Sequence, residues 1–322
     1  MRVVAFGYMT WGRRTIEAVL GAGHEIPLIV THPDSDNAYE KIFNESVAGL
    51  AADRSIPVLV RNRADDAELR EAIAGADADI MVVSNWRTWL PPEVFSIPRL
   101  GTLNVHDALL PAYAGFAPLN WALINDEPEV GVTAHMMNAE FDAGDVVLQR
   151  RTPITDDDVI TDLFDRTVAM FGPITVDALE LVAAADLAGG RTDWAPQDRR
   201  AASYFHRRTE EENRVDFSWP ARDLFNLVRA QLDPYPNAYC FHGATRLRIV
   251  AASVTDTPYG GTPGRIFIRR GRGVVIVAGA DARHGRNPGL LVERVRLDDG
   301  RELDAVEYFP HMGGYLSSRP VA

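Results

Sequence analysis

Cysteine and lysine are the residues that this sequence nearly lacks. Cys240 is the only cysteine among 322 residues, which excludes a disulfide within the chain and a metal site built from cysteines. Lys41 is the only lysine, the other basic residues being arginines, so we do not expect Schiff-base chemistry on a lysine amine. A chain without disulfides is typical of a reducing compartment, and we expect a cytoplasmic location.

Long apolar runs and positive charge are also scarce. No stretch approaches the roughly 20 apolar residues of a membrane span, and the N-terminus has no signal-peptide pattern, so we expect no membrane partner. The 45 acidic and 33 basic residues give a net charge of −12, and a field of that sign repels nucleic-acid phosphates. A nucleic-acid partner is therefore not expected. The 46% of hydrophobic residues is typical of a globular protein with room for two domains.

Strand-like and helical patterns alternate through residues 1–203. Apolar strand-like runs occur at 2–7, 27–32, 57–60, 78–84 and 100–106, with helical spacing between most of them. This alternation predicts an α/β domain with a Rossmann-like, doubly wound parallel sheet. Residues 160–190 read as one long helical region, or a helix broken at Gly172-Pro173.

Short strand patterns with turn signals follow in residues 204–322. The turns "HGAT", "RRGRG" and "DDGR" separate apolar runs in the manner of hairpins. They predict a smaller C-terminal β-rich domain, an OB-like β-barrel.

The turn after the first strand lacks the glycine fingerprint of dinucleotide-binding proteins. In "GYMTWG", bulky side chains stand where a pyrophosphate needs bare backbone N–H groups. A nicotinamide oxidoreductase is therefore disfavoured. Tyr8 and Trp11 either pack over the sheet edge or line a substrate mouth.

Two polar side chains end the apolar run at 100–106. Because side chains alternate along a strand, Asn104 and His106 project to the same face, at the strand end where open parallel sheets bind ligands. Asp142 lies in the turn "EFDAG" after the strand-like "GVTAHMM", and the two loops can bring it beside His106. A capping amide and a turn acid would be the simpler interpretation. His135, in the middle of that strand, is more typical of a core histidine.

An amide, an imidazole and a carboxylate without a nucleophile or a metal cluster fit acyl transfer to an amine. Asn104 can donate a hydrogen bond to the developing oxyanion, and a protonated His106 can donate a second bond and a proton. Asp142 can hold the imidazole and relay the proton that the amine loses.

The segments "LNVHDALLPAYAGFAPLNWAL" and "GVTAHMMNAEFDAGDVVLQ" strongly resemble the folate-dependent formyltransferases. That family includes methionyl-tRNA formyltransferase, glycinamide ribonucleotide transformylase and the sugar-amine formyltransferases. The segments "VDFSWPA" and "VRAQLDPYPNAY" resemble the C-terminal β-barrel domain of the tRNA and sugar enzymes. The resemblance implies the formyltransferase fold, the catalytic trio Asn104, His106 and Asp142, no metal, and N10-formyltetrahydrofolate as the formyl donor. The residues that it implies for donor binding are Arg87, Thr88, Trp89, Leu90, Ala108, Leu109, Leu110, Pro111, Asn138, Ala139, Glu140 and Phe141.

Departures from the family concern the acceptor. Many relatives have Ser where Ala108 stands and Arg where Ala114 stands, and the sugar-amine enzymes have a second Arg where Phe116 stands. The loss of both arginines weakens the case for an anionic acceptor such as a sugar nucleotide or tRNA.

The segments "GYMTWG", "NWRTWLP" and "YAGFAPLNWALIN" most resemble formyltransferases that act on N5-hydroxyornithine in siderophore biosynthesis. We therefore expect a small amine or hydroxylamine acceptor, with methionyl-tRNA or an amino-sugar nucleotide as alternatives. Two further functions remain as alternatives. One is a hydrolase that releases formate, and the other is a folate-binding sensor without catalytic activity. Candidate acceptor contacts, by location alone, are Tyr8, Trp11, Trp86 and Tyr113. The sequence does not indicate the oligomeric state.

Overall fold

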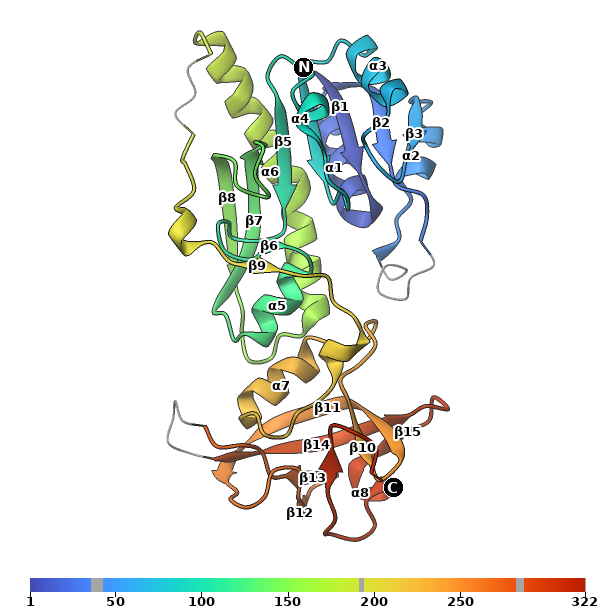
Figure 1. Cartoon of the computed structure of the whole chain (residues 1–322), viewed down its shortest axis with the longest axis vertical. Coiled ribbons are helices and arrows are strands. Elements are labelled where there is room, and N and C mark those ends of the chain that lie inside the picture. Colours follow the sequence, from blue (N-terminus) through green and yellow to red (C-terminus); the bar gives the residue numbers. More distant parts are fainter. Residues whose placement is uncertain (36–42, 191–193, 282–286, 322) are drawn as a thin grey trace. The chain divides into compact units, whose positions relative to one another are not determined.

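The computed structural model describes residues 1–35, 43–190, 194–281 and 287–321. The chain divides into two compact units. The first comprises Met1–Leu119, Glu129–Ile154 and Thr161–His206, and the second comprises Asn120–Pro128, Thr155–Ile160 and Arg207–Ala322. Each unit has its own sheet (Figure 1).

The first unit is built on a seven-stranded sheet in the order β3-β2-β1-β4-β5-β7-β8. Its strands are β1 (Arg2–Gly7), β2 (Glu25–Thr31), β3 (Val58–Val60), β4 (Ile80–Ser84), β5 (Thr102–His106), β7 (Glu129–Met136) and β8 (Val146–Pro153). The pairings from β3 through β5 are parallel, whereas β5–β7 and β7–β8 are antiparallel. The predicted doubly wound parallel sheet is therefore confirmed, with two antiparallel strands added beside β5.

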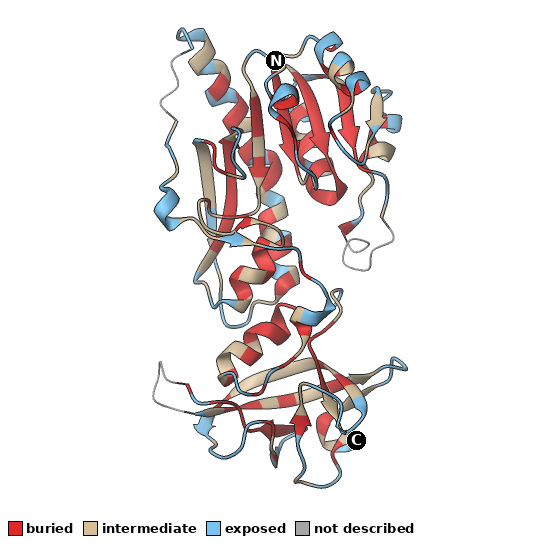
Figure 2. Cartoon of the chain, in the orientation of Figure 1, coloured by how far each residue is buried: buried red, intermediate tan, exposed pale blue. Residues whose placement is uncertain are grey.

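Helices cover both faces of this sheet. They are α1 (Met9–Gly21), α2 (Val47–Asp53), α3 (Ala67–Gly75), α4 (Pro92–Phe95) and α6 (Ile160–Leu187). Helix α5 (Pro118–Ile124) begins in the first unit, and its residues from Asn120 on belong to the second. Val4 and Phe6 of β1 share a buried cluster with Leu69 of α3 and Val94 of α4. The alternate residues of β1 face α1, where Gly7 lies close to Ile16. Figure 2 shows the central strands buried between these layers.

The two glycines of the first turn allow α1 to lie close to β1. A Cβ atom on Gly12 would lie 2.5 Å from the carbonyl carbon of Gly7, which real Cβ contacts do not tolerate. These glycines therefore serve the contact between strand and helix, in agreement with the missing dinucleotide fingerprint.

Helix α6 is 28 residues long and continues through Pro173, so the first of the two alternatives, one long helix, is correct. By length and composition it could cross a membrane, which differs from our expectation of no apolar stretch of that size. Its side chains at Leu163, Phe171, Ile174 and Ala178 are buried at helical spacing. That pattern is typical of a core helix, and it accounts for the apolar composition.

The second unit is an antiparallel sheet in the order β12-β13-β14-β11-β10-β16, with β15 paired to β14. Its elements are α7 (Ala221–Arg229), β10 (Tyr239–His242), β11 (Thr245–Pro258), β12 (Ile266–Arg270), β13 (Gly273–Ile276), β14 (Pro288–Leu297), β15 (Glu302–Asp304), α8 (Ala305–Tyr308) and β16 (Leu316–Ser317). An antiparallel bridge pairs Arg265 with Tyr315, and the N–H of Leu316 donates to the carbonyl of Gly264. These bonds join the two ends of the sheet, as the predicted β-barrel requires.

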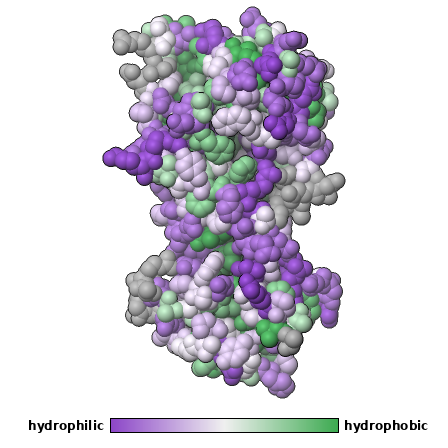
Figure 3. Space-filling model, viewed as in Figure 1, coloured by the Kyte–Doolittle hydropathy of each residue, from purple (hydrophilic) through white to green (hydrophobic). Residues whose placement is uncertain are grey.

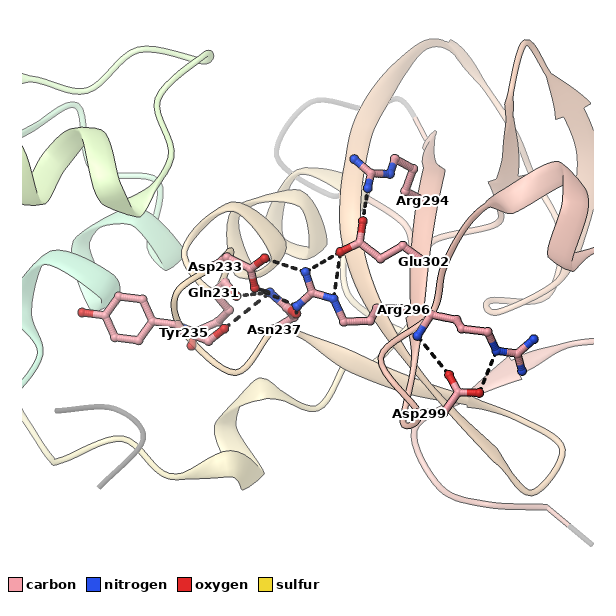
Figure 4. A network of polar contacts seen from close by, with 9 residues as sticks. Gln231, Asp233, Tyr235, Asn237, Arg294, Arg296, Asp299 and Glu302 are labelled. Carbon is pink, nitrogen blue, oxygen red and sulfur yellow. Dashed lines mark hydrogen bonds and ion pairs between the residues drawn. The ribbon is translucent and has the colours of Figure 1, made fainter. Parts of the chain in front are cut away.

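A polar network holds the loop after α7 against β14 (Figure 4). Arg296 donates to Oδ1 of Asp233 and to Oδ1 of Asn237, each at a distance of 2.8 Å. It also donates to Oε1 of Glu302 at a distance of 2.9 Å. Asn237 in turn donates to the carbonyl of Gln231 over 3.1 Å. One arginine thereby ties the "DPYPN" loop to the hairpin formed by β14 and β15.

Candidate active site

The candidate site lies at the carboxyl end of β5, between β4 and β7. Asn104 and His106 are half-buried, whereas Leu103 and Val105 between them are buried. This alternation confirms that Asn104 and His106 share one face of the strand. In the β5–β7 ladder Asn104 lies opposite His135, and His106 lies opposite Thr133.

Asn104 is oriented by His135. Nδ1 of His135 lies 3.2 Å from the carbonyl of Met136, and because a carbonyl only accepts, Nδ1 carries the ring proton. Nε2 of the neutral ring is then an acceptor, and it lies 3.0 Å from Nδ2 of Asn104. One N–H of the amide is thereby engaged, and the second remains available to a ligand.

Burial keeps His135 neutral. The side chain is 2% exposed, and desolvation lowers its pKa to about 4, with the positive charge of His106 acting in the same direction and Asp142 opposing it. The interpretation of His135 as a core histidine is therefore correct, and its hydrogen bond gives it an orienting role that the sequence did not reveal.

His106 contacts a carbonyl on one side and a carboxylate on the other. Its Nε2 lies 3.3 Å from the carbonyl of Tyr113, a long hydrogen bond in which Nε2 must be the donor. Its Nδ1 lies 3.9 Å from Oδ1 of Asp107. Burial raises the pKa of Asp107, against a lowering by the charge of His106. Sequence reasoning missed Asp107, although its position directly after His106 was a signal.

Asp142 lies at the same edge but is held by a backbone group. Its Oδ2 accepts from the N–H of Gly115 over 2.9 Å, and its φ of 47° lies in the left-handed region. Within the described parts of the chain, no ion pair of 4.0 Å or less joins Asp142 to His106. The loop after β5 and the loop after β7 thus meet, and the hydrogen bond that joins them is the one from the N–H of Gly115 to Asp142.

A segment that we call the strap, residues 195–205, crosses both of these loops. It contains β9 (Tyr204–Phe205), which pairs in parallel with β6 (Ala114–Gly115). Oγ of Ser203 accepts from the N–H of Tyr113 over 2.9 Å, and the rings of Tyr113 and Phe205 stack 4.7 Å apart. Gln197 donates to the carbonyls of Asp142 and Gly144, at distances of 3.0 Å and 2.8 Å respectively. No local motif marks this segment, so sequence reasoning did not find it.

The loop of Arg87 to Leu90 is braced by aromatic rings. The N–H of Arg87 donates to Nε2 of His32 over 3.0 Å, and its guanidinium lies 5.6 Å from the centre of the Tyr8 ring. Trp86 stacks on His32 at 3.8 Å. Thr88 and Trp89 are exposed, Trp89 at 52%, whereas Leu90 is buried.

The other two predicted donor loops differ in exposure. Ala108 and Leu110 are buried, and Leu109 and Pro111 are half-buried. The segment 138–141, Asn138, Ala139, Glu140 and Phe141, is exposed throughout, Phe141 at 43%. The Trp89 and Phe141 side chains are therefore the large apolar groups that these loops offer to a ligand.

The predicted acceptor contacts at the start of α1 are buried. Tyr8 is 5% exposed and meets His32 edge to face. Trp11 is 9% exposed and packs against Phe43 and Phe164, with its indole nitrogen unpaired. These contacts favour the packing interpretation for both residues, whereas Trp86 and Tyr113 are half-buried beside the candidate site.

Among the described residues, no group of three or more His, Cys, Asp or Glu side chains could hold a metal ion. The charged groups that act on the pKa of Asp107 are His106, Arg87 and Asp142.

Comparison with known proteins identifies both halves of the chain. Residues 1–179 match the family described as formyl transferase, and residues 207–312 match the formyl transferase C-terminal domain.

Solved structures share the fold at low identity. WlaRD, a sugar 3N-formyl transferase crystallised with dTDP and 5-N-formyl-THF, is 16% identical with a TM-score of 0.64, over 90% of this chain and 96% of its own. An N-formyltransferase from Helicobacter canadensis, in complex with folinic acid and dTDP-3-aminofucose, is 17% identical with a TM-score of 0.63, over 90% and 98%. HypX from Aquifex aeolicus in complex with tetrahydrofolic acid is 19% identical with a TM-score of 0.57. That match covers 96% of this chain but 46% of HypX, so the chain spans about half the length of HypX.

Proposed function

This chain belongs to the formyl transferase family, and we propose that it transfers a formyl group from N10-formyltetrahydrofolate to a small amine or hydroxylamine. The observation that carries the proposal is the half-buried pair Asn104 and His106 at the end of β5, each with a polar hydrogen that a ligand can engage. Asp142, tied to the adjacent loop through Gly115, completes the proposed catalytic trio. We propose residues 1–203 as the catalytic domain and 204–322 as the β-rich domain.

The exposed side chains of the donor loops fit a folate. Trp89 and Phe141 are exposed at 52% and 43%, and flat apolar rings of this kind can stack on a pterin. The three similar structures were determined with folate compounds, which supports the same donor. The proposed donor contacts are Arg87, Thr88, Trp89, Leu90, Ala108, Leu109, Leu110, Pro111, Asn138, Ala139, Glu140 and Phe141.

The proposed chemistry divides between three side chains. The donor supplies an activated formyl carbon. The free N–H of Asn104 stabilises the negative charge that develops on the formyl oxygen. His106 exchanges its long bond to Tyr113 for a bond to the substrate and delivers a proton from Nε2. Asp142 accepts the proton that the acceptor nitrogen loses through the carboxylate oxygen that is not bound to Gly115.

The surroundings of Asp142 support a neutral or cationic acceptor. Ala114 is buried, and the ring centroid of Phe116 lies 6.5 Å from that of Phe141. Apolar side chains thus occupy the positions where relatives with anionic acceptors have arginine. Together with the resemblance of "GYMTWG" and "NWRTWLP" to hydroxyornithine enzymes, this supports N5-hydroxyornithine as the acceptor and a role in siderophore biosynthesis. Trp86 and Tyr113 are the proposed acceptor contacts that are not buried.

An amino-sugar nucleotide is the second candidate acceptor. The observation in its favour is that two similar structures, matched over 96% and 98% of their own length, contain dTDP or a dTDP-sugar. Methionyl-tRNA is the third, and the net charge of −12 disfavours it.

Donor binding can be tested without knowing the acceptor. We expect 5-formyltetrahydrofolate to quench the tryptophan fluorescence of the wild-type chain on binding. Phe141→Ala should weaken this binding by about five- to tenfold, on the order of 1 kcal/mol for a lost ring contact. Phe267→Ala is the matched control, because Phe267 is 49% exposed on β12 of the other unit. Equal binding by wild type and Phe141→Ala would remove the 138–142 loop from the donor site, and no binding at all would refute the proposal.

A further inference from the structure

Asp107 is a second carboxylate at the candidate site, and the family resemblance gives it no role. It directly follows β5, and its Oδ1 lies 3.9 Å from Nδ1 of His106. The exposed fractions of the two side chains are 12% for His106 and 19% for Asp107, so both are largely shielded from water. Within the described residues, no other side chain forms a hydrogen bond or ion pair with this carboxylate.

The hydrogen bond from Nε2 of His106 to Tyr113 determines which form of Nδ1 the carboxylate of Asp107 faces. Nε2 of His106 donates to the carbonyl of Tyr113 and therefore carries a proton. In a neutral ring, Nδ1 would then present a lone pair to the carboxylate, which is repulsive. In the protonated ring, Nδ1 presents an N–H to the carboxylate, which is attractive. At 3.9 Å the two groups are in ion-pair contact without a hydrogen bond, and an N–H on the Nδ1 side is the arrangement in which this contact is attractive.

Asp142 is arranged differently. Its Oδ2 is engaged by the N–H of Gly115, and no ion pair to His106 is found among the described residues. The two carboxylates therefore have separate partners, Asp107 the imidazole and Asp142 the neighbouring loop.

We propose that Asp107 is the positioning residue of His106, facing the Nδ1 side of the ring and fixing the orientation of the imidazole. The inference rests on the proposed formyl transfer. In that reaction a bond forms between the acceptor nitrogen and the formyl carbon, and the bond from this carbon to N10 breaks. Nε2 of His106 supplies the proton that N10 takes up, and Asp142 receives the proton from the acceptor nitrogen. Return of that proton to His106 restores the starting state, and the role of orienting the ring falls to Asp107.

Charged groups from three elements act on Asp107. Burial raises its pKa most, the charges of His106 on β5 and Arg87 after β4 lower it, and Asp142 after β7 raises it. His135 on β7 adds no charge near neutral pH, because its pKa is lowered to about 4 by burial. His106 is thus the charged neighbour whose removal should change the titration of Asp107 most.

The pairing can be measured without substrate. We would label the full chain with 13C at the aspartate carboxyl groups and follow Asp107 by NMR between pH 3 and 8 in wild type and in His106→Gln. Loss of the adjacent positive charge should move the titration of Asp107 upward by roughly half a pH unit or more. An unchanged titration would overturn the inference, whether or not the proposed function is correct.

Kinetics with the full chain give the second readout. Asp107→Asn should lower kcat by ~10- to 100-fold, part of the roughly 10²–10⁴ that proton transfer by a positioned group contributes, with little change in KM. Asp107→Glu, which keeps the carboxylate, should restore part of kcat. Asp53→Asn, at the exposed end of α2, is the control of the same chemistry. A wild-type kcat in Asp107→Asn would refute the role. A wild-type chain that transfers no formyl group would instead refute the proposed function, and the NMR titration would still decide the pairing.

Discussion

Two histidines at the candidate site have different surroundings, and we propose a different role for each. His135 is 2% exposed and hydrogen-bonded at both ring nitrogens, so it is a fixed neutral acceptor for Asn104. His106 keeps a long hydrogen bond to a carbonyl and faces a carboxylate, so it can exchange a proton. The sequence places both residues on strands, and only burial and hydrogen-bond partners separate their roles.

Removal of the Asn104 amide should slow the reaction strongly. Loss of one donor to a developing oxyanion costs about 2.7–4 kcal/mol, so Asn104→Ala should lower kcat by about a hundred- to a thousandfold. The rate of tetrahydrofolate release measures this directly. Asn44→Ala, at an exposed position before α2, should leave the rate unchanged. Near-normal turnover of Asn104→Ala would contradict the assigned role.

The burial of His135 predicts a loss of stability in acid. Its pKa of about 4 in the folded chain lies below the value near 6.5 of an unfolded histidine. Between these values the unfolded chain binds a proton that the folded chain does not, so stability is full above pH 6.5 and falls as the pH drops toward 4. The total effect is on the order of 3 kcal/mol.

Urea unfolding at pH 7 and pH 4.5 measures this loss. His135→Gln, which retains an acceptor for Asn104, should lose less stability than wild type between the two pH values. His311→Gln, at an exposed histidine, should behave as wild type. Equal losses in wild type and His135→Gln would show that His135 does not govern the acid response.

The strap shows how distant elements complete the site. Residues 195–205 hold β6 through a parallel pairing and the 138–144 loop through Gln197. The site therefore depends on chain that lies some sixty residues beyond Asp142 in sequence.

Loss of the Gln197 side chain should loosen the loop that carries Asp142. Gln197→Ala removes two hydrogen bonds, each worth roughly 1 kcal/mol net, to the carbonyls of Asp142 and Gly144. We expect faster amide exchange in residues 138–144 and a several-fold lower kcat. Hydrogen–deuterium exchange with mass spectrometry gives the first readout. Arg200→Ala is the control, because it alters an exposed side chain of the strap that is bonded to Asp198. It should change neither the amide exchange of residues 138–144 nor kcat.

The sequence predicts those elements whose signal is local. The apolar runs at 2–7, 78–84 and 100–106 correspond to β1, β4 and β5, because buried parallel strands are nearly continuous apolar segments. The face shared by Asn104 and His106 follows from strand alternation. The bond from Asp142 to Gly115 could not be predicted, since a backbone donor leaves no mark in the side chains. The β6–β9 pairing joins residues about ninety positions apart and has no local pattern either.

At the scale of the whole molecule, charge narrows the choice of acceptor. The net charge is −12, and on the face seen in Figure 3 hydrophilic and apolar residues are interspersed in both units. Phosphate contacts are strongest at low salt, so a gel shift with methionyl-tRNA at low ionic strength is the most sensitive test of a tRNA acceptor. We expect no shift at micromolar protein.

The central claim is formyl transfer to a small amine, and the release of tetrahydrofolate from N10-formyltetrahydrofolate tests it most directly. N5-hydroxyornithine, ornithine, an amino-sugar nucleotide and methionyl-tRNA would be offered in parallel, and the absorbance of the product followed. We predict turnover with a small amine or hydroxylamine, fastest with N5-hydroxyornithine, and formate release no faster than background without an acceptor. Turnover with the sugar nucleotide or methionyl-tRNA alone would contradict the assigned acceptor class, and no turnover with any of the four would contradict the central claim.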